Sequence, residues 1–236
     1  MKKVFIKPKE WKMNLNAAHI DKGHMTAIQN HIEKYIGKID YIFHEHLSDN
    51  VHIDVCIIKP SEKIPYAVLV TMGMSAKPMN TPVGYNCSYC ELLAVLPKEW
   101  KLAEEDFKDE NNYWPIRTLK KLAVYPHACN TYLRLGHSIP NNDPPSPYAK
   151  NTKLCCSLLD VPPKEIPSKE DFIKLHLKNG KDIFFWNLFP IYREEMDFKL
   201  KQGYEKLMEL VESKEVPAIV NPNRINLCKK AFPFFK

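Results

Sequence analysis

Hydrophobic and polar positions alternate with a period of two between residues 51 and 58, and this pattern predicts a β-strand. Successive side chains of a strand point to opposite faces. One face therefore receives four β-branched residues: Val51, Ile53, Val55 and Ile57. His52 and Asp54 share the other face. We expect the β-branched face to pack into a core and the opposite face to be polar.

A nearly continuous apolar run, Tyr66–Met72, follows after a short connection that contains two prolines. Such a run is typical of a strand covered on both faces, and the short connection favours antiparallel pairing with the first strand. Gly73 provides a place where the chain can turn. Four other segments have the composition of strands: residues 39–43, 90–96 (ended by Pro97), 154–161 and 183–189 (ended by Pro190).

Helical spacing of apolar residues predicts three helices. They cover residues 18–36, a segment that opens at Trp114-Pro115 and is interrupted at Pro126, and residues 194–213 as the longest helix. The acidic stretch 104–112 is expected to be an exposed loop, and the proline-rich stretch 140–147 cannot form a regular element. Together these elements predict a single compact domain of the α/β (α+β) class, with a mixed, largely antiparallel sheet flanked by helices. We place it at residues 18–215, between an N-terminal extension (1–17) and a C-terminal tail (216–236).

Composition restricts the class of protein. The chain has 236 residues, of which 44% are hydrophobic and 26% charged, as in ordinary globular proteins. It contains no apolar run long enough to span a membrane and no secretory signal, and seven cysteines without framework spacing fit a reducing compartment. We therefore expect a cytoplasmic protein. The net charge of +6 is spread along the chain, which argues against nucleic acid as a partner.

Imidazole and carboxylate groups gather between residues 44 and 54. The group comprises His44, His46, Asp49, His52 and Asp54, all of which are ligands that suit divalent metal ions. In a strand, His44 and His46 would share a side, and His52 could approach them across a hairpin. Ligand types that are close in sequence do not by themselves define a metal geometry. We therefore expect a polar face whose groups satisfy one another, with no metal and no cofactor, and keep a metal site at His44, His46, His52 and Asp54 as the alternative.

Other candidate chemistry is weaker. Cys87 and Cys90 form a Cys-x-x-Cys pair, but they precede a predicted strand rather than open a helix, and they lack a second pair with zinc-site spacing. His127 and His137 could pair with a cysteine or with Ser75, but no Gly-x-Ser-x-Gly turn is present. We predict no catalytic residue.

An ordered series of short motifs resembles the suppressor of fused domain family, in its bacterial type. The motifs span roughly residues 40–205 and include Val51-His52-Ile53-Asp54-Val55, Val70-Thr71-Met72-Gly73-Met74-Ser75, Tyr113-Trp114-Pro115-Ile116, Gly136-His137-Ser138-Ile139 and Phe189-Pro190-Ile191-Tyr192-Arg193-Glu194-Glu195-Met196.

The resemblance implies a mixed sheet flanked by helices and a binding protein without enzyme activity. Animal members of the family hold transcription factors, partly by adding a peptide strand, and bacterial members resemble immunity proteins that neutralise a toxin. We therefore expect a protein-binding module, an intracellular immunity protein that occludes a toxin domain. The resemblance does not identify which residues of this chain contact the partner. The alternative is a metal-dependent hydrolase that uses the His44–Asp54 cluster.

Overall fold

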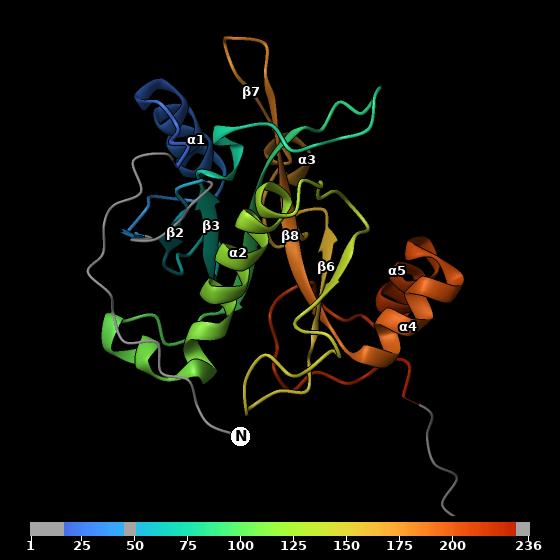
Figure 1. The fold of residues 1–236 in the computed structure, drawn as a ribbon. Helices are drawn as coiled ribbons and strands as arrows, with labels where there is room; N and C mark the ends of the chain where they lie inside the picture. Colours follow the sequence, from blue (N-terminus) through green and yellow to red (C-terminus); the bar gives the residue numbers. More distant parts are fainter. Residues whose placement is uncertain (1–16, 45–50, 230–236) are drawn as a thin grey trace, which may run out of the picture.

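One twisted sheet organises the chain in the computed structural model, which describes residues 17–44 and 51–229 (Figure 1). Its strands lie in the order β1-β2-β3-β4-β8-β6-β5, and β7 pairs with one end of β8. Neighbouring strands are antiparallel except for β4 and β8, which run parallel. The strands are β1 Tyr41–Phe43, β2 Asp54–Ile58, β3 Tyr66–Met72, β4 Tyr89–Pro97, β5 Ser138–Pro140, β6 Cys156–Asp160, β7 Lys174–His176 and β8 Asp182–Ile191. This is the predicted mixed, largely antiparallel sheet.

Helices cover both faces of this sheet. They are α1 Lys22–Tyr35, α2 Glu110–Ala128, α3 Lys169–Phe172, α4 Arg193–Gln202 and α5 Tyr204–Ser213, with short 3-10 helices η1 Met74–Ala76 and η2 Glu104–Lys108. The apolar face of α2 packs on one side of the sheet, while α1 and α3 pack on the other. The α4–α5 pair covers β6 and the end of β8 in a third cluster. Among the described residues, no helix combines the length and the apolar character needed to cross a bilayer.

The alternation in the 51–58 segment sorts its residues between two cores. Val51, Ile53, Val55 and Ile57 all lie in the α2-side core, as predicted. Cys56 and Ile58 lie in the core under α1, so the opposite face of β2 is covered rather than polar. The strand itself begins at Asp54, because Val51 forms an isolated bridge with Ala18 instead of pairing within the sheet.

Several predicted boundaries are wrong because tertiary contacts override local signals. The stretch 104–112 is not a loop: it contains η2 and the first turn of α2, whose N-cap is Asp109. Both Pro115 and Pro126 lie inside α2. Pro115 has no N–H to donate to the Asn111 carbonyl, and the side-chain amide of Asn151 donates to that carbonyl instead, at 3.4 Å.

Pro190 lies within β8 instead of ending it. The Pro190 carbonyl accepts a hydrogen bond from the Arg224 side chain at 2.9 Å and therefore faces away from β6. β4 pairs with β8 only as far as Asn187, so no strand on that side requires an N–H from Pro190.

The segment 194–213 was expected to be one helix, and it is two. Gly203 breaks it with φ of 97° and ψ of 164°, a conformation reserved for glycine, and α2 is the longest helix among the described residues. Leu200, near the end of α4, is 66% exposed.

The residues after 215 contact the sheet. Val220 is fully buried, and its amide donates to the Val95 carbonyl at 2.8 Å. Arg224 is also buried and pairs with Glu195. The division of the chain at residues 17 and 215 stays a prediction.

Candidate functional site

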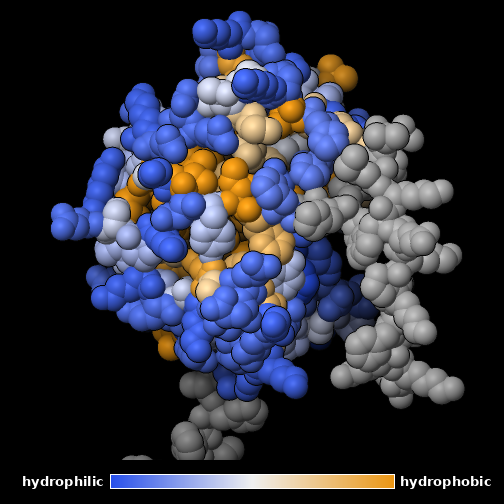
Figure 2. Space-filling model, turned by 90° about the vertical axis from the view of Figure 1, so that its left-hand side faces the viewer, coloured by the Kyte–Doolittle hydropathy of each residue, from blue (hydrophilic) through white to orange (hydrophobic). Residues whose placement is uncertain are grey.

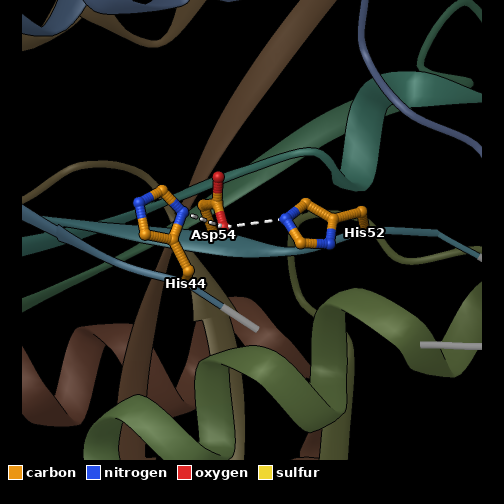
Figure 3. Close-up of side chains that lie close together, drawn as sticks. All are labelled: His44, His52 and Asp54. Atoms are coloured by element: carbon orange, nitrogen blue, oxygen red, sulfur yellow. Dashed lines mark hydrogen bonds and ion pairs between the residues drawn. The ribbon is translucent and has the colours of Figure 1, made fainter. Parts of the chain in front are cut away.

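The register of the first hairpin brings part of the histidine-rich segment together. Tyr41 lies opposite Ile57 and Phe43 opposite Val55, so the next residue, His44, falls opposite Asp54. His52 lies two residues before Asp54 and points to the same carboxylate (Figure 3). Asp54 Oδ1 lies 3.0 Å from His44 Nδ1 and 3.0 Å from His52 Nε2. His46 and Asp49 lie outside the described residues.

Burial is uneven across this cluster. The side chain of Asp54 is only 9% exposed, whereas that of His52 is 31% exposed and that of His44 is 60% exposed. His19 stacks on His52 with ring centroids 4.9 Å apart. The cluster therefore has a buried anionic oxygen at its base and imidazoles that reach solvent. His19 carried no signal in the sequence.

Ser75 belongs to a different network, built around the buried carboxylate of Glu91. Ser75 Oγ donates to Glu91 Oε1 at 2.6 Å and lies 3.0 Å from His24 Nε2. Glu91 also accepts from Thr71 Oγ1 and from the amides of Gly73 and Ser75. Burial raises the pKa of Glu91, and these donors oppose that rise.

The order of groups in this network does not suit nucleophilic catalysis. In a catalytic triad the histidine lies between the nucleophile and the acid. Here Ser75 lies between Glu91 and His24, and its hydroxyl donates a hydrogen bond to the carboxylate. The arrangement ties the turn after β3 to β4. The sequence signal for this network was Glu91, a glutamate inside the otherwise apolar strand segment 90–96.

The other candidates are structural. His127 Nε2 lies 3.0 Å from the Met74 carbonyl, and burial lowers the pKa of the imidazole. Burial raises the pKa of the Cys87 thiol, and that of the fully buried Cys90 rises well above its ordinary value. Reactive thiols have a depressed pKa, so these shifts run against a redox role.

A groove of about 660 Å³ lies where α4 and α5 approach β8 and the turn before β5. Phe184 and Trp186, on one side of β8, stack with ring centroids 5.5 Å apart in its wall. The other lining residues that matter here are Tyr85, Arg134, His137, Lys199, Leu200, Tyr204 and Glu205. The sequence did not indicate this groove, because its residues come from four distant segments.

Two cations, Arg134 and Lys199, line the groove together with one carboxylate, Glu205. Arg134 Nε lies 3.3 Å from His137 Nε2, and its guanidinium covers the Tyr85 ring. Lys199 Nζ donates to Ser138 Oγ at 3.3 Å. Burial lowers the pKa of Lys199, and repulsion by Arg134 lowers it further. In the part of the chain that the structure describes, no carboxylate forms an ion pair with either residue.

The edges of the sheet are a second type of surface. Among the described residues β1 pairs only with β2, and β5 pairs only with β6. Tyr41, Ile42 and Phe43 of β1 are all half-buried. Figure 2 shows the side of the molecule that is on the left in Figure 1, where hydrophobic residues gather in the centre within a hydrophilic border.

Comparison with known proteins identifies the family. The family model "Suppressor of fused protein (SUFU)" matches residues 49–225, three quarters of the chain. The chain belongs to the suppressor of fused family. A search of curated proteins found no significant match.

Solved structures of the suppressor of fused family share the fold. A protein of Neisseria gonorrhoeae FA 1090, described as a suppressor of fused homolog, superimposes with a TM-score of 0.63 at 16% identity, covering 88% of this chain and 98% of that chain. The Sufu-Fu complex matches with a TM-score of 0.58 at 12% identity, covering 87% of this chain and 92% of that chain. Drosophila Suppressor of Fused also matches, with a TM-score of 0.48 at 13% identity and covering 75% of this chain and 42% of that chain. The first two of these comparisons show that the chain has the fold of the suppressor of fused structures.

Proposed function

We propose that this suppressor of fused protein captures a polypeptide partner, and that the partner is a toxin domain which it neutralises inside the cell by occlusion. The family match over residues 49–225 carries the proposal of protein binding. The toxin as partner rests on the similarity of the motifs to bacterial members and on the fold shared with the Neisseria protein. Neither the family nor the fold favours the metal-dependent hydrolase.

The groove beside α4 and α5 is the surface that we assign to the partner. Aromatic and apolar side chains that remain partly accessible lose water-exposed area when a partner covers them, which favours association. Leu200 is 66% exposed and Tyr85 is 39% exposed, although both are large hydrophobic residues. Side chains of this kind, grouped in a concave surface, are typical of an interface.

Charge indicates what the partner presents to this groove. Arg134 and Lys199 repel each other, and in the free protein they lack a carboxylate partner among the described residues. An aspartate or glutamate of the partner would form charge-assisted hydrogen bonds with both. We therefore expect the bound segment to carry an acidic residue flanked by apolar or aromatic side chains.

Matched charge reversals on α4 test this assignment. Lys199→Glu places a negative charge in the groove, whereas Lys201→Glu makes the same change at an exposed position of the same helix. The chain and its variants would be co-expressed with a toxin-like reading frame adjacent to its gene. We expect the wild type and Lys201→Glu to restore growth and to co-purify with the toxin, and Lys199→Glu to lose at least about 10-fold in affinity, since truncating or opposing a desolvated charge costs 2 kcal/mol or more.

The outcomes separate the parts of the proposal. Toxicity that is unchanged by co-expression contradicts the immunity function. If Lys199→Glu and Lys201→Glu capture the toxin equally well, the groove is not the binding surface, and the β1 edge is the candidate that remains.

A further inference from the structure

Three potential metal ligands converge from separate positions in the first hairpin. They are His44 Nδ1, His52 Nε2 and an Asp54 carboxylate oxygen, and all three atoms lie within 4.8 Å of one another (Figure 3). We propose that these residues form a binding site for a divalent first-row transition metal ion of the zinc class.

The spacing of the three atoms is close to that of a coordination shell. Nitrogen and oxygen ligands lie about 2.0–2.2 Å from a zinc ion, which places neighbouring ligand atoms about 3–3.5 Å apart. The two nitrogen–oxygen distances, both 3.0 Å, already fall in this range. Only the two imidazoles have to approach each other, and the side chain of His44 is 60% exposed and has room to move.

The charge of the cluster also favours a cation. Asp54 contributes a carboxylate that is 91% shielded from solvent, and in the described part of the chain its ion-pair partners are the two histidines alone. Histidine provides a positive charge only when it is protonated. A bound divalent ion would add positive charge directly beside this buried carboxylate, and a buried carboxylate without compensation is costly.

Contacts behind the cluster hold His52 in place. Its ring stacks on His19, and its backbone amide donates to the Ala18 carbonyl at 3.0 Å. Its carbonyl lies so close to Gly73 that a Cβ atom at residue 73 would be 2.0 Å from the His52 oxygen. This support restricts the ring to a narrow range of positions, as the outer contacts of metal ligands do.

The ligand set selects the class of ion. Two imidazoles and one carboxylate suit Zn²⁺ and its neighbours, whereas Mg²⁺ and Ca²⁺ prefer oxygen ligands alone. Three protein ligands leave a fourth position for water or for a side chain of another molecule. The site lies at the β1–β2 end of the sheet, whereas the proposed partner groove lies beside β8, α4 and α5, and strands β3 and β4 separate the two. The metal site is therefore independent of the proposed partner binding.

Titration of the chelator-treated full-length protein with Zn²⁺, followed by calorimetry, tests the proposal. We expect one equivalent to bind. His52→Ala and Asp54→Asn should weaken that binding at least about 100-fold, because even the loss of an outer partner of a ligand costs about 10–100-fold. His176→Ala is the matched control: this exposed histidine also contacts an aspartate, Asp182, but no third potential ligand joins them among the described residues.

His44→Ala keeps the test decisive if the buried variants fail to fold, because its side chain is mostly exposed. We expect this variant to have the circular dichroism spectrum of the wild type and a Zn²⁺ affinity lower by at least about 10-fold. In nitrogen-15 NMR, Zn²⁺ should shift the imidazole signals of His44 and His52 and leave that of His176 in place. Absence of stoichiometric binding, wild-type affinity in folded His44→Ala, or an equal loss in His176→Ala would overturn the proposal.

Discussion

Arg224 carries a charge into the interior of the protein. It is 7% exposed, and its guanidinium reaches both oxygens of Glu195, with Nη1 donating to Oε1 at 2.7 Å. Glu195 also accepts from the amides of Tyr192 and Leu227. This single pair therefore joins the first turn of α4 to the chain near residue 224.

Replacing Arg224 should strongly destabilise the protein. Arg224→Ala leaves the Glu195 carboxylate buried without its cation, and breaking a buried pair in this way costs about 3–5 kcal/mol. Arg117→Ala is the control, since the Arg117–Glu110 pair is 27% and 49% exposed and should contribute about 1 kcal/mol or less. Urea unfolding measures both changes. Equal losses in the two variants would contradict the importance of the buried pair.

At the scale of elements, α1 is attached to the rest of the protein through a buried histidine. His31 is 8% exposed, its Nε2 lies 2.9 Å from the Phe172 carbonyl at the end of α3, and its ring stacks on Phe172 and Phe185. Burial lowers the pKa of His31 below its ordinary value of 6.5. The folded protein therefore holds this imidazole neutral at a pH where the unfolded chain binds a proton.

This difference predicts a loss of stability in acid. The pKa of His31 is lower in the folded protein than in the unfolded chain. Its contribution to the free energy of unfolding is therefore present above the unfolded pKa and is lost as the pH falls through the folded pKa. The free energy of unfolding should therefore fall as the pH drops below about 6.5 toward the lower folded pKa. In His31→Gln, which keeps a donor for the Phe172 carbonyl but does not titrate, the fall should be smaller. An identical pH profile for the variant and the wild type would contradict this role. The fall would then come from His24, His127 and His137, whose pKa burial also lowers.

Two elements illustrate where local patterns mislead. Apolar spacing continues through Gly203 without interruption, yet the chain turns there because α4 and α5 both have to pack on β6 and β8. Pro115 was expected to begin a helix, yet α2 starts at Glu110 because Asp109 caps it there. The helix tolerates the proline because the Asn151 side chain supplies the donor that the proline lacks. In both cases, contacts from distant residues determine the boundary.

At the scale of the whole molecule, the segment after residue 215 closes the core. Val220 extends the hydrogen bonding of β4, and the Thr152 hydroxyl donates to the Pro222 carbonyl at 2.8 Å. Asn187 donates to the Ala218 carbonyl at 2.9 Å. Residues 216–229 therefore contribute contacts to three separate strands and loops.

A shortened chain tests whether the domain extends beyond residue 215. We expect a chain that ends at residue 215 to lose cooperative unfolding or to aggregate, because it exposes the site of Val220 and leaves Glu195 unpaired. A chain that ends at residue 229 is the control and should unfold like the full chain. Thermal unfolding followed by circular dichroism distinguishes them. Cooperative unfolding of the shorter chain at the wild-type temperature would support the boundary expected from the sequence.

The sequence by itself determined the features that depend on near neighbours. Alternation placed Val55 and Ile57 on one face, because the period of two is a local property of the strand backbone. The continuous apolar run at Tyr66–Met72 likewise indicated a strand covered on both sides. The order of motifs likewise pointed to the suppressor of fused family, which the family match confirms. Only the tertiary structure decided which side chains meet. The groove with Arg134 and Lys199, the pairing of Arg224 with Glu195, and the approach of His44 to Asp54 depend on strand register and helix packing, which bring together residues that no local period connects.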